Sequence, residues 1–414
     1  MFELSNKTSS KNWLLFLSLS LLLGVLLRLS FPGDIEYKED EQYMFATSQA
    51  IGVTQPWPEL GMVSGGQVKN PGMSVWVFAV LAKVFHATTP PELAQAVGIL
   101  NILGLLALAF FSLRLLPEKE RLAWCWATAF AAVSPAAILF QRKIWAQSTL
   151  PFFCVLLWIA WHYRKEKAGA FFWGLVGLCL AQVHMSGFFL IAGLFLWTVY
   201  RDKKAQWGFW IAGSLVGAVP LIPWLKYLFS NAGSGSGLLD WFWLFYPKYW
   251  IYWLTDALGL GLQHSLKWAG LFDFMRYPVI GGMNSCLVGL LHVLILVCAV
   301  RIFIAAKRAS GGFLKGLGDS SETGLALNSV LIVSGVLMTL CCFKINQHYL
   351  IMSFPLEWVW LARLGLRDAR SGQRYLMLIW VAQALISAWF LIYVHVHHGI
   401  PAGDYGTAYQ YQIP

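Results

Sequence analysis

The sequence predicts an all-α, polytopic membrane protein with about eleven transmembrane helices, and three observations carry this prediction. Of its 414 residues, 58% are hydrophobic and only 12% are charged, about half the charged share of a soluble domain. The mean hydropathy is +0.60, and the chain has 22 Trp residues, a side chain that favours membrane–water interfaces. Long apolar runs recur along the whole chain, and about 20 such residues suffice to cross a bilayer.

The apolar runs define the expected spans. The first, 13–31, is long for a signal-peptide core and has no Ala-x-Ala cleavage site, so we interpret it as a retained anchor helix. Segment 72–86 is about 15 residues long and contains Lys83, so we expect a helix that lies along the outer membrane surface or dips into it. The expected spans are 13–31, 93–115, 122–140, 147–163, 169–183, 186–200, 207–229, 279–304, 324–343, 348–364 and 374–395.

Basic residues orient these spans. Lys and Arg precede the first span and occupy every second connection after it, as is typical of cytoplasmic loops. The N-terminus of this multi-pass protein is therefore expected in the cytoplasm and the C-terminus outside. These loops explain the net charge of +10, and we find no basic soluble face for nucleic acid. The basic connections contain Lys7 and Lys11; Arg114, Lys119 and Arg121; Arg164, Lys165 and Lys167; Arg201, Lys203 and Lys204; Lys307, Arg308 and Lys315; and Arg363, Arg367, Arg370 and Arg374.

The spans divide the chain into three parts. The first, 1–229, is a transmembrane module that includes the first outer loop, 32–92. An outer loop rich in Trp and Tyr follows at 230–278, and 279–414 holds the last spans and an external tail. Two alternatives stay open for the tail, which either covers a site or forms a disordered end. None of the seven Cys residues has metal-ligand spacing, so neither zinc nor a disulfide framework is predicted.

The first outer loop carries the main candidates for chemistry. Five acidic residues fall within eight positions there, a quarter of all the Asp and Glu in the chain. From the fourth of them onward the pattern is helical, and acids stabilise the start of a helix. One interpretation is therefore a capped, solvated helix, and the other is a general base or cation site at the membrane surface. The five acids are Asp34, Glu36, Glu39, Asp40 and Glu41, and Tyr43 follows them.

Several cations on the expected outer side lie where a lipid phosphate would bind. Arg142 and Lys143 follow the outer end of the third span, and Lys344 opens the turn before the tenth span, close to His348. Each basic side chain has the alternative of reaching to lipid headgroups. His184 occupies a tight outer turn, where a hydrogen-bonded turn residue is the alternative to a ligand-binding one.

Five motifs occur in a fixed order over most of the chain. They are Asp40-Glu41-x-Tyr43, Asn70-Pro71, Ser134-Pro135…Arg142, His184-Met185-Ser186-Gly187 and His348-Tyr349…Pro355. In this order the chain resembles the bacterial GT-C glycosyltransferases of the protein-O-mannosyltransferase and lipid A aminoarabinose transferase type. The resemblance implies a GT-C-like bundle of about eleven transmembrane helices with juxtamembrane helices on its outer face, in a bacterial inner membrane.

The resemblance also implies a reaction. A sugar would move from a polyprenyl-phosphate donor to an acceptor hydroxyl on a lipid, glycan or protein, with inversion, on the outer face of the membrane. A first-loop Asp would be the general base. The resemblance implies Asp40, with Glu41 beside it, for catalysis, and Lys69 with Lys344 or His348 for the donor phosphate. From their positions in the sequence we add Asp34 for catalysis, Arg142 and Lys143 for the phosphate, and Glu36, Tyr43 and His184 for substrate.

Two departures from the family pattern bear on metal use. Many relatives carry Pro-Pro where this chain has Asn70-Pro71, and some carry a second Asp where it has Ala146-Gln147-Ser148. Because the second Asp is missing from that place, the sequence leaves the requirement for a divalent cation open. No other cofactor is expected.

A membrane transporter or flippase for a lipid-linked or envelope solute is the main alternative. Transporters usually place ionisable groups at mid-membrane and show inverted repeats, whereas here the acids gather in an outer loop and no repeat is visible. A polysaccharide polymerase subunit or a scaffold is a further alternative. A polymerase of the O-antigen type usually carries its large outer loop late in the chain.

Overall fold

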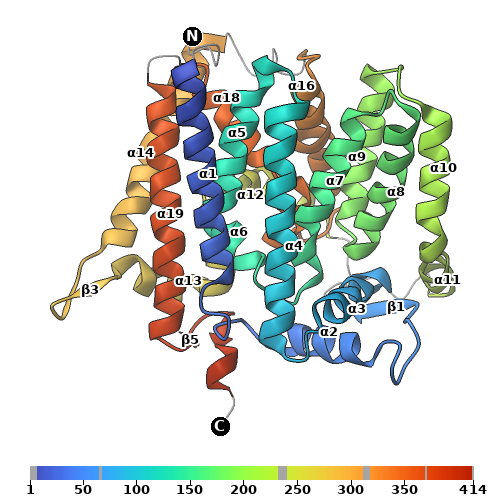
Figure 1. The fold of residues 1–414 in the computed structure, drawn as a ribbon, viewed down its shortest axis with the longest axis horizontal. Helices are drawn as coiled ribbons and strands as arrows, with labels where there is room; N and C mark the ends of the chain where they lie inside the picture. Colours follow the sequence, from blue (N-terminus) through green and yellow to red (C-terminus); the bar gives the residue numbers. More distant parts are fainter. Residues whose placement is uncertain (1–6, 65–67, 232–239, 311–317, 369–370, 413–414) are drawn as a thin grey trace.

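The computed structural model describes residues 7–64, 68–231, 240–310, 318–368 and 371–412. Upright helices stand side by side in a bundle (Figure 1). Helix α1 (Lys7–Leu29) starts at one end, which we call the N-terminal end, and the chain finishes at the other, the C-terminal end.

Six helices are long and apolar enough to cross a bilayer within the described residues. They are α1; α4 (Pro90–Phe110) with η1 (Phe111–Leu115); α10 (Trp207–Ala218) with η3 (Val219–Leu221) and α11 (Ile222–Ser230); α14 (Leu287–Ser310); α16 (Glu322–Leu327) with η5 (Asn328–Ser334) and α17 (Gly335–Leu340); and α19 (Gly372–Val396). The chain is thus an all-α, multi-pass membrane protein.

Shorter helices stand at the other five expected spans. They are α5 (Glu118–Val133) with α6 (Pro135–Phe140), α7 (Leu150–His162), α8 (Lys167–Val183), α9 (Gly187–Arg201) and α18 (Leu356–Gly365). The 3-10 turns η2 (Ala146–Thr149) and η6 (Gln347–Ser353) precede α7 and α18. The count of eleven spans, like the division into three parts, stays a prediction.

Several expected spans are interrupted, and two of them show how. Segment 122–140 breaks between α5 and α6 because Ser134 is extended, with φ −58° and ψ 130°, as is usual for a residue before proline. The prediction that segment 279–304 is helical throughout is wrong. Its first residues form a hairpin of β3 (Val279–Ile280) and β4 (Met283–Asn284). Gly281 and Gly282 make the turn with φ of 58° and 82°, a region that glycine adopts readily.

Small residues and buried polar groups join the helices. At Gly213 of α10, an added Cβ would lie 1.9 Å from the Phe171 carbonyl oxygen of α8, so only glycine allows this approach, as is common between membrane helices. Arg28 at the end of α1 donates to Gln141 Oε1 at 2.8 Å and to the Ala132 carbonyl at 2.8 Å. These bonds fix α1 against α5 and the turn after α6.

The first loop lies across the C-terminal end of the bundle (Figure 1). It contains α2 (Glu39–Ala50), the hairpin of β1 (Leu60–Val63) and β2 (Lys69–Pro71), and α3 (Met73–Phe85). Ile51, Val75 and Phe78 are fully buried between these elements. Segment 72–86 therefore forms a helix across the bundle end.

Two further segments complete this end. The aromatic loop forms η4 (Trp241–Phe245), α12 (Lys248–Ala257) and α13 (Gln263–Arg276). The tail forms β5 (Gly399–Ile400), β6 (Gly406–Thr407) and η7 (Tyr409–Tyr411). The described part of the tail is thus folded, and it contacts the first loop.

Candidate functional site

A pocket of about 780 Å³ opens at the C-terminal end of the bundle. The first loop, the turn after α6, α13, η6 and the tail all contribute to it. Its lining residues are Glu36, Tyr37, Lys38, Glu39, Asp40, Glu41, Gln42, Lys143, Trp145, His264, His348, Asp404, Gly406, Thr407 and Gln412. Such a volume is typical of small-molecule sites.

Asp40 is placed in this pocket by the start of α2. Glu41 accepts a hydrogen bond from the Lys38 backbone N–H at 3.2 Å, which satisfies one of the free donors at the helix start. Asp40 itself is half-buried and accepts a hydrogen bond from Trp145 Nε1 at 3.0 Å. Within the described residues, this carboxylate forms no ion pair. Asp40 is therefore positioned by a neutral donor and keeps acceptor capacity toward the pocket.

The two lysines of the pocket are both tied to one carboxylate. Lys143 Nζ lies 2.5 Å from Glu36 Oε2, and Lys38 Nζ lies 3.1 Å from Glu36 Oε1. Lys143 also lies 3.9 Å from Glu41 and sits over the Trp145 ring at 4.8 Å. Burial raises the pKa of Glu41, and the charge of Lys143 partly offsets this rise. Lys143 is thus a buried ammonium in a network of carboxylates.

Imidazole and indole rings form another part of the lining. The His348 ring centroid lies 4.7 Å from that of Trp145 and 5.4 Å from that of His264. Behind them, His184 contacts Gln147, with their Nε2 atoms 3.1 Å apart. Burial lowers the pKa of His184 to about 4, and burial together with Lys143 lowers the pKa of His264. These two imidazoles are therefore neutral near pH 7 and act as hydrogen-bonding groups.

Of the eleven residues predicted for the site, the structure brings five to the pocket lining. They are Asp40, Glu41, Glu36, Lys143 and His348. His184 lies behind the lining, with its ring centroid 6.3 Å from that of His348.

Asp34 and Arg142 lie close by but face other partners. Asp34 is buried and holds His395 Nδ1 at 2.7 Å. Arg142 is buried and donates to the Leu27 carbonyl at 3.0 Å and to the Phe31 carbonyl at 2.9 Å. Both side chains organise the chain around the end of α1.

The remaining predicted residues lie outside the lining. Lys69 is exposed on β2, where its carbonyl accepts a bond from Trp224 of α11 at 2.7 Å. Lys344 and Tyr43 are also exposed. The roles of Lys69, Lys344 and Tyr43 in the site stay predictions, because none of them lines the pocket.

Sequence reasoning missed several lining residues. Trp145 follows Lys143 by two positions, and only the structure shows that its indole N–H reaches Asp40. His264 comes from α13, within the outer loop rich in Trp and Tyr, for which the sequence suggested no role in the site. Asp404 and Thr407 come from the tail, for which no pattern favoured a place in the site over a free end.

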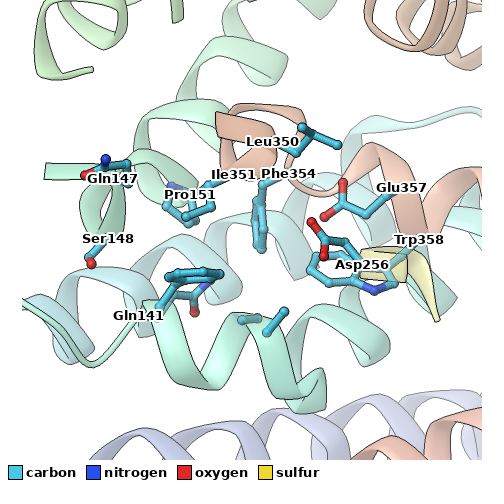
Figure 2. Close-up of a pocket in the computed structure, with 13 residues that line it drawn as sticks. Gln141, Gln147, Ser148, Pro151, Asp256, Leu350, Ile351, Phe354, Glu357 and Trp358 are labelled. Atoms are coloured by element: carbon cyan, nitrogen blue, oxygen red, sulfur yellow. The ribbon is translucent and has the colours of Figure 1, made fainter. Parts of the chain in front are cut away.

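A second cavity, of about 30 Å³, lies inside the bundle. Figure 2 shows the carboxyl groups of Asp256 and Glu357 pointing toward one another at its edge. Gln347 donates to Asp256 at 2.5 Å, and Ser353 donates to Glu357 at 3.1 Å. This volume is of the order that holds a water molecule and is too small for a sugar. The larger pocket is therefore the candidate site.

The described residues contain no group of three or more His, Cys, Asp or Glu side chains that could hold a metal ion. The carboxylates of Glu36 and Glu41 face Lys143 instead.

Comparisons with known proteins bear on the fold. No family model and no curated protein matches this sequence. The structure is similar to the crystal structure of apo ArnT from Cupriavidus metallidurans, with 12% identity and a TM-score of 0.51, over 97% of this chain and 78% of ArnT. The two proteins share a fold, which agrees with the GT-C-like bundle that the sequence resemblance implies.

Two further matches have lower TM-scores. ArnT bound to undecaprenyl phosphate gives 13% identity and 0.49, over 92% of this chain and 64% of ArnT. The apo oligosaccharyltransferase of Archaeoglobus fulgidus gives 15% and 0.47, over 91% of this chain and 56% of that enzyme. The GT-C fold predicted from sequence motifs is confirmed by the first match, which at this identity shows a shared fold alone.

Proposed function

We propose that this protein is a glycosyltransferase that moves a sugar from a polyprenyl-phosphate donor to an acceptor hydroxyl, with inversion. The position of Asp40 carries the proposal. Its carboxylate lies in a large open pocket, is oriented by Trp145 and forms no ion pair with a described residue. A carboxylate placed in this way is suited to accept a proton from a bound hydroxyl.

Asp40 acts as the general base in this scheme. It removes the proton of the acceptor hydroxyl while the acceptor oxygen forms a bond to the anomeric carbon of the sugar. The bond from that carbon to the phosphate oxygen breaks, and the phosphate leaves with the electron pair. Direct displacement from the opposite side inverts the configuration at the anomeric carbon.

Lys143 and His348 stabilise the leaving phosphate in this scheme. The Lys143 ammonium is buried beside the pocket, where a fixed positive charge interacts strongly with developing negative charge. His348 Nδ1 is buried and has no hydrogen-bond partner among the described residues, and an imidazole nitrogen can donate to a phosphate oxygen. Undecaprenyl phosphate, which ArnT binds, is the carrier to test first.

We place the pocket on the external side of a bacterial inner membrane. Helices α7, α9 and α18 end toward the N-terminal end of the bundle (Figure 1). Arg201 and Arg363 lie in the last turns of α9 and α18, and Arg164 directly follows α7. Cytoplasmic loops are enriched in such residues, which supports a cytoplasmic N-terminal end. The pocket lies at the opposite end.

The test is sugar transfer by purified protein in vesicles that contain undecaprenyl-phosphate sugars, with cell-envelope acceptors outside. We expect Asp40→Asn to lower the rate by at least about 100-fold, the lower bound for loss of a general base. Glu59→Gln is the matched control, because Glu59 is an exposed carboxylate of the same loop outside the pocket lining. Its rate should equal that of the wild type.

Two outcomes would contradict the proposal in different ways. Full transfer by folded Asp40→Asn would remove Asp40 as the base. Absence of transfer from every donor, with movement of lipid or solute across the same vesicles, would favour a transporter or flippase.

A further inference from the structure

We propose that the tail segment 399–412 forms a wall of the pocket that binds the acceptor, and that this acceptor is a saccharide. The inference rests on the proposed glycosyl transfer. It assigns a substrate class and a binding segment that the proposed reaction leaves open.

The tail is held against the first loop by hydrogen bonds between distant parts of the chain. The Tyr409 N–H donates to the Ile35 carbonyl at 3.0 Å, and the Gln410 N–H donates to the Gly33 carbonyl at 3.1 Å. Gln412 Nε2 donates to the Tyr37 carbonyl at 3.1 Å. The tail is therefore docked along the segment that leads into α2.

Asp34 is the centre of this docking. Its carboxylate accepts from Gln410 Nε2 and contacts His395 Nδ1, and its carbonyl accepts from the hydroxyl of Tyr405. Asp34 and Tyr405 are both buried, at 2% and 6% exposure. A buried carboxylate that satisfies several partners is costly to disturb. Asp34 is thus a positioning residue for the tail.

The docked tail presents hydrogen-bonding groups to the pocket. Asp404, Thr407 and Gln412 line it with a carboxylate, a hydroxyl and an amide, beside Gly406. The tail brings no cation to the lining, so it is unsuited to hold the donor phosphate. Carboxylate, hydroxyl and amide groups together accept and donate the hydrogen bonds that sugar hydroxyls require.

The whole lining favours a saccharide over a peptide. Among the lining residues that the structure describes, none is Ala, Val, Leu, Ile, Met or Phe. Peptide recognition usually relies on pockets for apolar side chains or on an exposed strand edge. The lining instead offers polar groups around the rings of Trp145 and Tyr37. It therefore fits a polyhydroxylated molecule.

The test compares Thr407→Val and Asp34→Asn with the wild type, using undecaprenyl-phosphate sugar as donor and either oligosaccharides or Ser/Thr-containing peptides as acceptors. Thr407→Val removes one exposed hydroxyl and keeps the side-chain shape. We expect a roughly fivefold rise in KM for the oligosaccharide, the cost of about one neutral hydrogen bond. The KM for the donor should rise less than the KM for the oligosaccharide, because the tail contacts the acceptor in this proposal.

Ala402→Ser is the matched control, because Ala402 is exposed in the same hairpin and does not line the pocket. Asp34→Asn should raise the acceptor KM in the same direction, with more rapid proteolysis of the tail.

An unchanged acceptor KM in Thr407→Val, an equal rise in the donor KM, or a preference for peptides would overturn this inference and leave the transferase proposal intact. A wild type that neither transfers nor hydrolyses the donor would overturn both.

Discussion

The two ends of the bundle use charge in opposite ways. At the N-terminal end, Arg164 is fully buried and lies 2.5 Å from both Asp202 and Glu322, and Arg363 lies 2.5 Å from Asp319. At the C-terminal end, five carboxylates and two lysines line the pocket, and both lysines contact the same carboxylate. The buried Arg164 is fully paired at the first end, whereas at the second end the carboxylates outnumber the lysines and leave acceptor capacity free. Charge therefore stabilises the first end and is available for chemistry at the second.

The largest effect on stability is expected at the N-terminal end, where Arg164 and Arg363 form ion pairs. Arg164→Met leaves Asp202 and Glu322 without their main partner, so the free energy of unfolding should fall by about 3–5 kcal/mol, as for other broken buried ion pairs. Transfer per folded molecule should not change, because Arg164 is remote from the pocket. Denaturation of the purified protein in detergent measures the first quantity, with exposed Lys119→Met as control. If transfer fell by more than the amount of folded protein, Arg164 would contribute to the reaction itself, and the contrast between the two ends would be wrong.

At the pocket, the expected effect falls on activity. Lys143→Met should reduce transfer roughly 10- to 100-fold, the range for one lost hydrogen bond to a charged group. It should also destabilise the protein, because Glu36 loses its closest partner. The double variant Lys143→Met/Glu36→Gln removes both charges, so it should recover stability and remain slow. Recovery of transfer in the double variant would show that Lys143 serves only to neutralise Glu36.

The smallest effect is expected in the tail. Asp404 Oδ1 lies 2.7 Å from Lys267 Nζ, in an exposed pair. Burial opposes ionisation, but the hydrogen bond and charge of Lys267 dominate and hold the pKa of Asp404 below its usual 3.8. The stabilisation is therefore complete above about pH 3.8 and is lost as the pH falls through the lower folded value.

For such a pair we expect less than about 1 kcal/mol between wild type and Asp404→Asn at pH 7. The difference should vanish in acid. Urea unfolding of the two proteins at several pH values measures it, and a difference that grows in acid would contradict the assigned sign.

The sequence predicted the helical bundle well because each long apolar run and each basic connection can be recognised from local sequence alone. Breaks within spans were harder to predict. The hairpin at 279–284 depends on Gly281 and Gly282, which in this apolar context resemble the small residues of membrane helices. The Ser134-Pro135 motif is visible in the sequence, but the sequence analysis did not predict that it breaks the third span.

The site was only partly predictable because it is assembled from segments far apart in the chain. Asp40, Lys143 and His348 meet there although about 300 residues separate the first from the last. Two residues adjacent in sequence have different partners. Lys143 faces the pocket, whereas Arg142 binds carbonyl groups at the end of α1. No periodicity distinguishes these two directions in an irregular turn.

The composition of the pocket lining also constrains inhibitors. A compound that fills this space must satisfy carboxylates, lysines and amides with few apolar contacts, so it would be strongly polar. Such compounds cross bilayers poorly, because each desolvated polar group carries a large transfer cost. A pocket on the external face would remove this obstacle at the inner membrane, since the inhibitor would reach its target from water without crossing that bilayer.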